Sequence, residues 1–235
     1  MFKKLFMLFK IGRKLSTSGA ISSIYQIFNP PIGIKILFFV IGFSFGDKKT
    51  NNNLSPGAKL CNALQEMGTT FIKLGQFLAT RPDIIGENIS KELEKLQDKL
   101  PAFELREAKK ILREELGQEN FSQINDLTEP IAAASIAQVH FATIKNSSEN
   151  KKVAIKILRP NIEKIFNEEL DALMLLAYIA ENFITKTKRL KLVEVVQLLR
   201  EITNVEMDLR FEAAAANELY ENTKNDIGFK VPKIY

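Results

Sequence analysis

The sequence has very little of the chemistry on which many catalytic and metal sites depend. Of its 235 residues, one is cysteine and one is histidine. A single cysteine, Cys61, excludes an intramolecular disulfide framework and a zinc site built on cysteines, and its place in a helical pattern favours a buried structural thiol. With His140 as the only histidine, a Ser/His/Asp triad or a two-histidine metal centre lacks its parts.

Acidic residues are almost missing from the first 60 positions, which hold nine Lys/Arg and one acid, Asp47. This stretch therefore has a charge of +8, whereas residues 61–235, with 24 bases and 27 acids, have a charge of −3. Basic character confined to one end argues against nucleic acid as a partner and for an anionic membrane surface or a targeting role. A long apolar run is also lacking, because residues 36–45 are too few to span a bilayer comfortably.

The basic arm, residues 1–46, opens with the sequence MFKKLFMLFKIGRKLSTSGAISS. Lysine and arginine alternate there with phenylalanine and leucine, a pattern that favours an amphipathic helix lying in a membrane interface. A mitochondrial-type transit peptide, which is also basic, rich in serine and free of acids, is the alternative, and a solvated tail is a third. Residues 47–56 are expected to be a linker because Gly, Asn, Ser and Pro gather there.

The rest of the chain has the 46% hydrophobic and 26% charged composition of an ordinary globular protein. Apolar residues at three- and four-residue spacing, with Pro82 and Gly117 as stop signals, predict amphipathic helices. These helices are expected over Gly57–Arg81, Ser90–Leu100 and Glu104–Leu116. Residues 57–122 are therefore expected to form a helical extension.

The helical period fades between Ile124 and Ile157. Residues 135–145 and 151–158 alternate between apolar and polar side chains and predict two strands joined by the turn NSSEN. Helices return at about 162–183 and 190–220. This order predicts an α+β fold with a small antiparallel sheet in residues 123–235, and not a βαβ repeat.

Small residues precede the first of these strands at a spacing typical of a phosphate-binding hairpin. Ala132, Ala134, Ala137 and Val139 match the kinase pattern GxGxxGxV with alanine at each glycine position. Lys156 follows Val139 by 17 residues inside the sequence VAIK, as does the strand lysine that binds phosphates in kinases. Alanine cannot adopt positive φ cheaply, and its methyl group keeps phosphates further away than glycine does. We therefore predict a modified nucleotide site.

Either feature alone has a simpler interpretation. VAIK is a common strand edge, and the alanine loop, defined as Ala132–Ser135, is by itself more typical of a turn of helix. The consistent separation of the two favours the hairpin.

Four motifs in order identify a family resemblance. They are KLGQFLATRPDIIGENISKELEKLQDKLP (73–101), PIAAASIAQVH (130–140), VAIKILRP (153–160) and EMDLRFEAAAAN (206–217). This set strongly resembles the UbiB family of atypical, protein-kinase-like proteins, the aarF-domain kinases involved in ubiquinone biosynthesis. The similarity runs from about Gly57 to residue 235.

The resemblance implies roles for particular residues. The KxGQ motif of the family matches Lys73, Gly75 and Gln76, and lies on a helix that folds over the nucleotide pocket. The alanine loop, with Ala132, Ala133, Ala134 and Ser135, replaces the glycine-rich loop and alters nucleotide preference. Lys156 is the strand lysine, with Val139 beside the nucleotide, and Glu206 and Asp208 form the ExD motif.

Helix geometry adds a hypothesis about ion pairs. At about 100° per residue, Asp208 and Glu212 share one face of a continuous helix, while Glu206 points elsewhere. We therefore expect Glu212 to pair with Lys156, and Glu206 and Asp208 to hold Lys73. The alternative is that these acids only solvate a helix face.

The resemblance also predicts what the whole protein does and which parts these residues lack. It implies an unorthodox kinase or ATPase that binds ATP or ADP with Mg²⁺ and supports ubiquinone biosynthesis at a membrane. No segment after Lys156 matches the catalytic-loop Asp and Asn or the metal-binding Asp of a second lobe, and Asp226–Gly228 is expected to be a turn. We therefore expect that this chain holds no metal ligand and does not transfer a phosphoryl group. We expect it to be a fragment, one half of a split gene or a decayed copy.

The expected partners follow from the same resemblance. They are an anionic membrane surface, ubiquinone-biosynthesis proteins or lipid precursors, and a separately encoded second lobe. The expected location is the cytoplasmic face of a bacterial inner membrane, with a mitochondrial membrane as the alternative. The alternative function is a non-catalytic module that binds a membrane or a partner.

Overall fold

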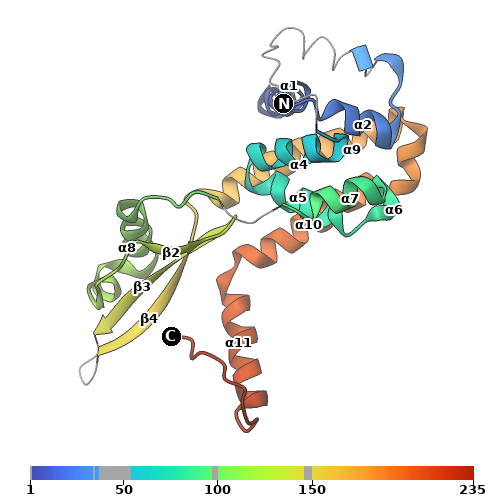
Figure 1. The fold of residues 1–235 in the computed structure, drawn as a ribbon. Coiled ribbons are helices and arrows are strands. Elements are labelled where there is room, and N and C mark those ends of the chain that lie inside the picture. Colours follow the sequence, from blue (N-terminus) through green and yellow to red (C-terminus); the bar gives the residue numbers. More distant parts are fainter. Residues whose placement is uncertain (1, 34, 37–53, 97–99, 146–149) are drawn as a thin grey trace.

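The structure is a computed structural model and describes residues 2–33, 35–36, 54–96, 100–145 and 150–235. Figure 1 shows a helical body, a sheet unit beside it and one helix, α11, that extends away from the body. The fold is α+β, as predicted, with a small antiparallel sheet.

The helical body buries most of the apolar surface of the described residues in a single cluster. Phe166, Leu170 and Leu93 lie in this cluster and are almost completely inaccessible to solvent. The elements of the body are α1 (Phe2–Thr17), α2 (Ile21–Phe28), α4 (Pro56–Met67), α5 (Thr69–Ala79), α6 (Pro82–Ile85), α7 (Glu87–Leu93), α9 (Ile162–Phe183), the 3-10 helix η1 (Thr185–Leu190) and α10 (Leu192–Met207).

The single helix predicted over 57–81 is two helices, α4 and α5. Gly68 separates them with φ +103°, a backbone conformation that side-chain-bearing residues rarely adopt. The apolar spacing continues across the break, so periodicity alone did not reveal it. The helix predicted over 90–100 is also displaced, since α7 spans Glu87–Leu93, and residues 97–99 lie outside the described residues.

The sheet unit consists of α8 (Leu105–Ser122), β1 (Ile124–Asn125), β2 (Pro130–Ala133), β3 (Ala137–Lys145) and β4 (Asn150–Leu158). β1 and β2 follow one another along one edge of β3, and β4 pairs antiparallel along its other edge. The predicted strands are therefore confirmed, while the turn at 146–149 lies outside the described residues. The helical backbone of α8 is interrupted at Gly117 (φ +76°), the residue at which we predicted its end, and a second helical segment follows the kink up to Ser122.

The sheet has one covered face and one open face. Ile157 on β4 packs with Ala108 and Leu112 of α8, which makes a second, smaller apolar cluster. Because side chains alternate along a strand, the neighbouring positions 154 and 156 point to the opposite face, where they are exposed. The helices on either side of the strands in the chain therefore go to different places. Helix α8, before the strands, packs on the sheet, whereas α9 and α10, after them, pack in the helical body.

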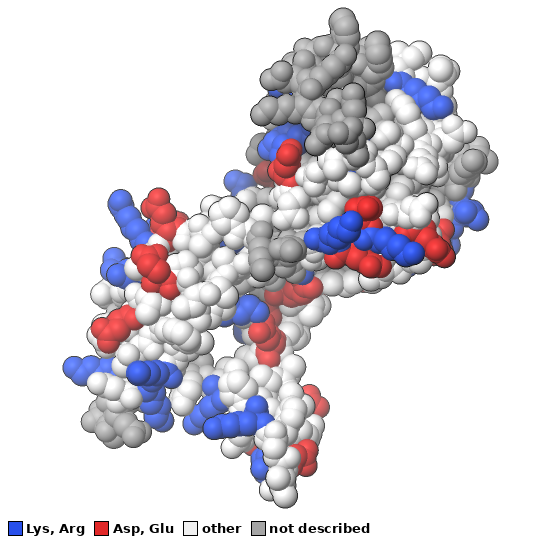
Figure 2. All heavy atoms as spheres, viewed as in Figure 1, with Lys and Arg blue, Asp and Glu red and all other residues white. Residues whose placement is uncertain are grey.

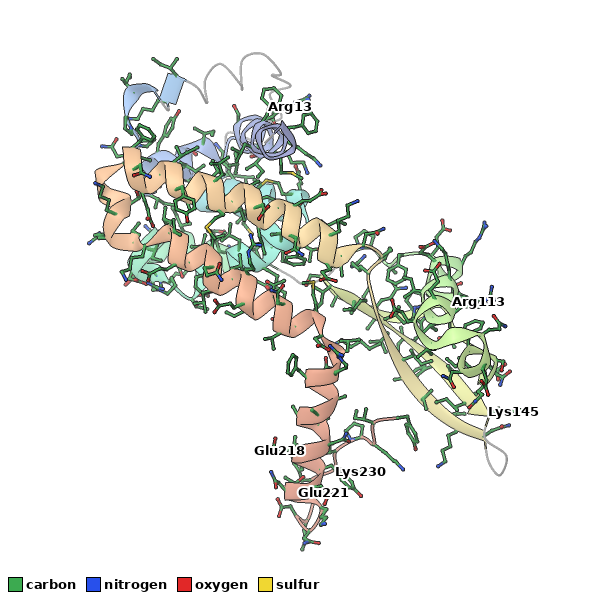
Figure 3. All side chains as sticks on the ribbon, turned by 180° about the vertical axis from the view of Figure 1, so that it is seen from behind. Arg13, Arg113, Lys145, Glu218, Glu221 and Lys230 are labelled. Carbon is green, nitrogen blue, oxygen red and sulfur yellow. The ribbon has the colours of Figure 1, made fainter. Side chains whose placement is uncertain are left out.

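Helix α11 (Leu209–Thr223) has no buried residue. The helix predicted over 190–220 is broken at Asp208, where the backbone is extended (φ −91°, ψ 92°), so α10 and α11 are separate helices. Figure 3 shows the side chains of α11, Glu218 and Glu221 among them, projecting away from the helical body.

The N-terminal arm is not separate from the body over its described residues. Helix α1 packs against α9 and α4, with Ile11 and Leu15 buried. Lys14 Nζ donates to the carbonyl of Glu66 at 2.8 Å. The apolar run at 37–45 and most of the expected linker, residues 47–53, lie outside the described residues. None of the helices in the described ranges has the length and apolar character needed to cross a bilayer.

Candidate nucleotide site

The positions that predicted a nucleotide site lie in one row across the sheet. Val139 on β3 is paired with Ala132 on β2 and with Lys156 on β4. Residues directly opposite each other in an antiparallel sheet point to the same face, so all three side chains share a face. The face is the open one, since their neighbours along the strands are buried on the other face: Ile157 packs against α8, and Gln138 bonds Phe103 in the segment before it.

The alanine loop is part of a tight hairpin turn and not of a helix. The Ala134 amide donates to the Ala137 carbonyl at 2.8 Å and closes the turn between β2 and β3. Ala132 and Ala134 are exposed, Ala133 is half-buried and Ser135 is buried. Ile136, which follows the loop, is packed in the main cluster of the helical body. The loop is therefore anchored on one side and open on the other.

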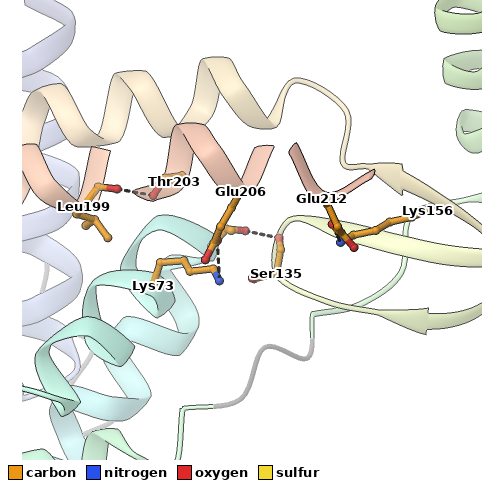
Figure 4. Close-up of polar contacts among 8 residues, drawn as sticks. Lys73, Ser135, Lys156, Leu199, Thr203, Glu206 and Glu212 are labelled. Carbon is orange, nitrogen blue, oxygen red and sulfur yellow. Dashed lines mark hydrogen bonds and ion pairs between the residues drawn. The ribbon is translucent and has the colours of Figure 1, made fainter. Parts of the chain in front are cut away.

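Lys156 and Glu212 form the predicted ion pair, with Lys156 Nζ 2.5 Å from Glu212 Oε2 (Figure 4). They come from β4 and from the first turn of α11. Their side chains are 38% and 60% exposed, so solvent screens the pair and its net contribution to stability is expected to be below about 1 kcal/mol. The pair orients the lysine and does little to hold the fold together.

Lys73 and Glu206 form a second ion pair at 2.9 Å, between α5 and α10 (Figure 4). The side chains are 17% and 36% exposed, so this pair is less screened than the first. Gln76 is half-buried on the same helix as Lys73. Gly75 is buried, and a Cβ there would lie 2.2 Å from Leu96 Cδ1, so its role in this structure is close packing.

The prediction that Asp208 helps to hold Lys73 is wrong in this structure. Asp208 lies at the break between the helices, where Oδ1 accepts from the Arg210 amide at 3.0 Å and its carboxylate binds the Arg210 side chain. The guanidinium of Arg210 lowers the pKa of Asp208. The hypothesis assumed one continuous helix, whereas Asp208 lies at the break between two helices and caps α11.

Two residues that touch the alanine loop were missed. Thr69 Oγ1 donates to the Ser135 carbonyl at 2.9 Å, and Arg159 donates to the Ala134 carbonyl from Nε at 3.1 Å and Nη2 at 2.8 Å. Arg159 stands at the end of β4 next to Pro160, inside a quoted motif, but only the folded chain shows what it contacts.

His140 has a structural role. It is fully buried, its Nδ1 lies 2.7 Å from the Thr128 carbonyl and its Nε2 lies 2.9 Å from Gln138 Nε2. Because a carbonyl only accepts and the amide nitrogen only donates, the proton is assigned to Nδ1 and the ring is neutral. Gln138 also bonds both backbone groups of Phe103. Gln138 thus joins the sheet to the segment before α8, while His140 joins it to the Thr128 carbonyl between β1 and β2.

Other candidate chemistry is weak. Cys61 is half-buried and not fully buried as we expected, and this burial raises the pKa of its thiol. Asp226–Gly228 lies in a turn, with Gly228 at φ +84°. Within the ranges that the structure describes, no group of three or more His, Cys, Asp or Glu side chains is arranged to hold a metal ion. The lysine and the small-residue hairpin remain the features best suited to a ligand.

Comparison with known proteins identifies the family. A sequence model of the ABC1 atypical kinase-like domain matches residues 95–235. A protein named probable protein kinase UbiB from Marinobacter nauticus is 36% identical over 207 residues, which cover 87% of this chain and 36% of that protein. Proteins of the same name from Pseudomonas fluorescens and Azotobacter vinelandii are 40% and 39% identical and match 77% and 74% of this chain, with 34% and 32% of their own lengths covered.

The chain spans about a third of the length of these relatives. No solved structure matches it. The match to the domain covers more than half of the chain, from the segment before α8 to residue 235, and includes the sheet, the alanine loop and both helices of the ExD region. The chain belongs to the ABC1 atypical kinase-like family.

Proposed function

We propose that this chain supplies the nucleotide-binding lobe of an atypical kinase-like protein, with ATP or ADP as ligand. The observation that supports this best is the in-register row of Ala132, Val139 and Lys156 on the open face of the sheet. The row joins a small-residue hairpin to a strand lysine on one face, the combination with which protein kinases bind phosphates. Family membership supports the same proposal.

Each residue of the row has a distinct task in this proposal. Lys156 attracts the phosphates, and Glu212 keeps its ammonium group over the open face. Val139 offers an apolar contact to the base, and the methyl groups of Ala132 and Ala134 limit how closely phosphates approach the backbone. ATP with Mg²⁺ would supply the transferable phosphoryl group, and we assign no magnesium ligand among residues 1–235.

The KxGQ and ExD residues are proposed to regulate access to this site. Lys73 is tied to Glu206 at 2.9 Å, and Thr69, one turn earlier on α5, binds the alanine loop at Ser135. Helix α5 therefore contacts both the loop and α10. Movement of α5 would alter the loop and the ExD region together.

The wider role follows from the family and from the names of the relatives. We propose that the complete protein is a kinase or ATPase that supports ubiquinone biosynthesis at a membrane, with lipid precursors, other proteins of that synthesis and a second lobe as partners. The membrane is the cytoplasmic face of a bacterial inner membrane or, as the alternative, a mitochondrial membrane. Residues 1–235 by themselves are proposed not to transfer a phosphoryl group.

Nucleotide binding is testable directly with a fluorescent ATP or ADP analogue and the 235-residue chain. Lys156→Ala should weaken binding at least about tenfold, because a charge-assisted contact to phosphate is lost. Lys152→Ala is the matched control, since Lys152 is exposed on the same face of the same strand, and should stay within about twofold of wild type. Equal binding by wild type and Lys156→Ala contradicts the proposal.

Phosphate release from ATP tests the claim about phosphoryl transfer separately. The expected rate for residues 1–235 is the background rate. A rate above background that Lys156→Ala abolishes would show that the chain transfers phosphoryl groups without a second lobe.

A second function, binding to an anionic membrane surface, has its own support in α1. Phe6 is 72% exposed and Phe9 40% exposed on a basic helix whose other side packs on α9. Lys10 and Arg13 belong to the same helix, and apolar and basic side chains together favour the interface of an anionic bilayer. Figure 2 shows that blue and red side chains are interspersed over most of the visible face, a mixture that argues against a nucleic-acid surface there.

Co-sedimentation with vesicles of mixed neutral and anionic lipid tests this second function. Phe6→Ser should lower the bound fraction several-fold, because an aromatic side chain is lost from the exposed face that is proposed to enter the lipid. Phe183→Ser is the control, since Phe183 is 69% exposed at the other end of the body on α9. Equal losses in both variants, or no binding by wild type, contradict a membrane role for α1.

A further inference from the structure

Three consecutive carbonyls at the end of the alanine loop are all held by hydrogen bonds. The Ala134 carbonyl accepts from the Arg159 side chain, and the Ser135 carbonyl accepts from Thr69 Oγ1 at 2.9 Å. The Ile136 carbonyl accepts from the Arg159 backbone amide at 2.9 Å. Arg159 thus binds the alanine loop at Ala134 with its side chain and binds Ile136, the residue after the loop, with its backbone amide.

The same guanidinium extends to a second segment. Arg159 Nη1 donates to the Pro101 carbonyl at 2.9 Å, and Nη2 lies 3.4 Å from the Leu100 carbonyl. These residues precede α8, so Arg159 joins the end of β4, the alanine loop and the entry to the sheet unit. The contact requires a planar, forked donor, since Nη1 donates to the segment before α8, Nε donates to the alanine loop and Nη2 lies between the two.

The environment of Arg159 is suited to holding the backbone of these segments in place. The side chain is half-buried, and burial lowers the pKa of its guanidinium. Each hydrogen bond that the structure describes for it ends on a backbone carbonyl. Backbone carbonyls fix the path of the main chain, so these bonds determine the shape of the turn.

We propose that Arg159 is the positioning residue of the nucleotide loop, which holds the alanine loop in one conformation before any ligand binds. A carbonyl oxygen is a hydrogen-bond acceptor and repels phosphate, so a loop whose carbonyls are already held does not need to reorganise them on binding. Arg159 replaces the flexibility of a glycine-rich loop with a fixed turn. Only the consequence for ligand affinity depends on the proposed nucleotide function.

Backbone hydrogen exchange of the 235-residue chain tests the positioning role without any ligand. The probe is the Ala134 amide, whose bond to the Ala137 carbonyl closes the turn. Arg159→Lys, which keeps the charge but not the fork, and Arg159→Gln, which keeps neither, should each speed its exchange about tenfold. Arg200→Lys, which changes an arginine bound to Asp171 in the helical body, should leave the loop at the wild-type rate.

Thr69→Val provides a second variant if Arg159→Gln fails to fold. It removes only the bond to Ser135 and should speed loop exchange by a smaller factor. Loop exchange at the wild-type rate in Arg159→Lys overturns the proposal, because the charge alone would then suffice. The same holds if Arg200→Lys loosens the loop equally, since the effect would then be general.

Affinity for the fluorescent ADP analogue separates this inference from the proposed function. Faster loop exchange together with binding that is weakened several-fold in Arg159→Lys supports both. Faster loop exchange in a chain whose wild type binds no nucleotide supports the positioning role and contradicts the proposed function. Unchanged loop exchange together with binding that depends on Lys156 supports the proposed function and contradicts the positioning role.

Discussion

At the scale of single residues, Gly75 illustrates how closely α5 is packed. A Cβ at this position would lie 2.2 Å from Leu96 Cδ1 and 2.9 Å from Leu64 Cδ1, and both leucines are buried. The glycine of the KxGQ motif therefore has a packing role in this chain in addition to any role beside a nucleotide. Packing of this kind holds Lys73 at a fixed distance from α10.

Gly75→Ala should destabilise the fold by about 1–3 kcal/mol, because the leucines must move to admit the methyl group. The measurement is the free energy of unfolding from denaturant titration. Gly33→Ala is the control, since a Cβ there meets no heavy atom within 4 Å. Leu96→Ala, which makes room, should recover part of the loss when combined with Gly75→Ala. An effect as small as that of the control would show that the leucines yield freely.

Glu169 is a buried acid of α9, 9% exposed, and burial raises its pKa. The Thr70 hydroxyl and the charges of Lys10 and Lys14 offset this effect only in part, while Glu168 adds to it. A raised pKa means that the folded state binds the proton more tightly than the unfolded state does. Its contribution to stability is therefore lost as pH rises from the ordinary glutamate value through the raised one.

Glu169→Gln should raise the thermal midpoint at pH 7, because the buried group no longer has to ionise. It should also flatten the fall in stability that wild type shows as pH rises from 4 toward neutrality. Thermal unfolding followed by circular dichroism over this pH range is the measurement. Glu218→Gln, on exposed α11, is the control and should keep the wild-type profile. A lower midpoint at pH 7 would show that the lysines outweigh burial.

At the scale of elements, the break at Asp208 decides which acid meets which lysine. Glu206 lies in the last turn of α10 and binds Lys73, and Glu212 lies in the first turn of α11 and binds Lys156. A continuous helix would extend α11 along the axis of α10 and away from that contact. An aspartate inside an otherwise helical pattern is a known signal for a helix start, and here its side chain caps α11.

Asp208→Ala should lower the helix signal in circular dichroism, because the cap on the Arg210 amide is lost. Asp208→Asn keeps a capping oxygen and should remain close to wild type. Since the pKa of Asp208 is lowered, its charged contribution is present above the ordinary aspartate value and is lost as pH falls through the lowered one. Equal loss of helix in both variants would show that the charge, and not the cap, matters.

The elements that sequence reasoning predicted well are those with a strong local period. The strands at β3 and β4 and the helix α9 lie within one or two residues of their expected bounds, because alternation and 3.6-residue spacing are properties of neighbouring residues. Breaks inside long helices were missed, since Gly68 and Asp208 change the backbone without changing the apolar spacing.

At the scale of the whole molecule, two apolar clusters stabilise the described residues. The large one lies in the helical body and the small one joins α8 to the sheet around Leu112 and Ile157. Ile136 connects the parts, since it lies at the end of the loop but packs in the large cluster. The sheet unit is thus attached to the body directly after the alanine loop.

Leu112→Ala should cost about 2–4 kcal/mol and should loosen the sheet unit more than the helical body. Hydrogen exchange should become faster in β3 and β4 while α9 keeps its protection. Leu93→Ala, in the large cluster, is the paired variant and should loosen α7 and the helices on which it packs, α4 and α5. If each variant opens both parts equally, the molecule is one cooperative unit and the division into two parts has no energetic meaning.

The sequence by itself determined the family motifs, the strands and the separation of Lys156 from the alanine loop, because strand and hairpin geometry depend on neighbouring residues. It also predicted the contact between Lys156 and Glu212, while the functional roles of these residues stay predictions. Only the tertiary structure decided that Asp208 caps a helix and that Thr69 and Arg159 hold the loop. The side-chain contacts of Thr69 and Arg159 with the loop join residues from 25 to 66 positions apart, and the burial of apolar surface in the helical body brings them together.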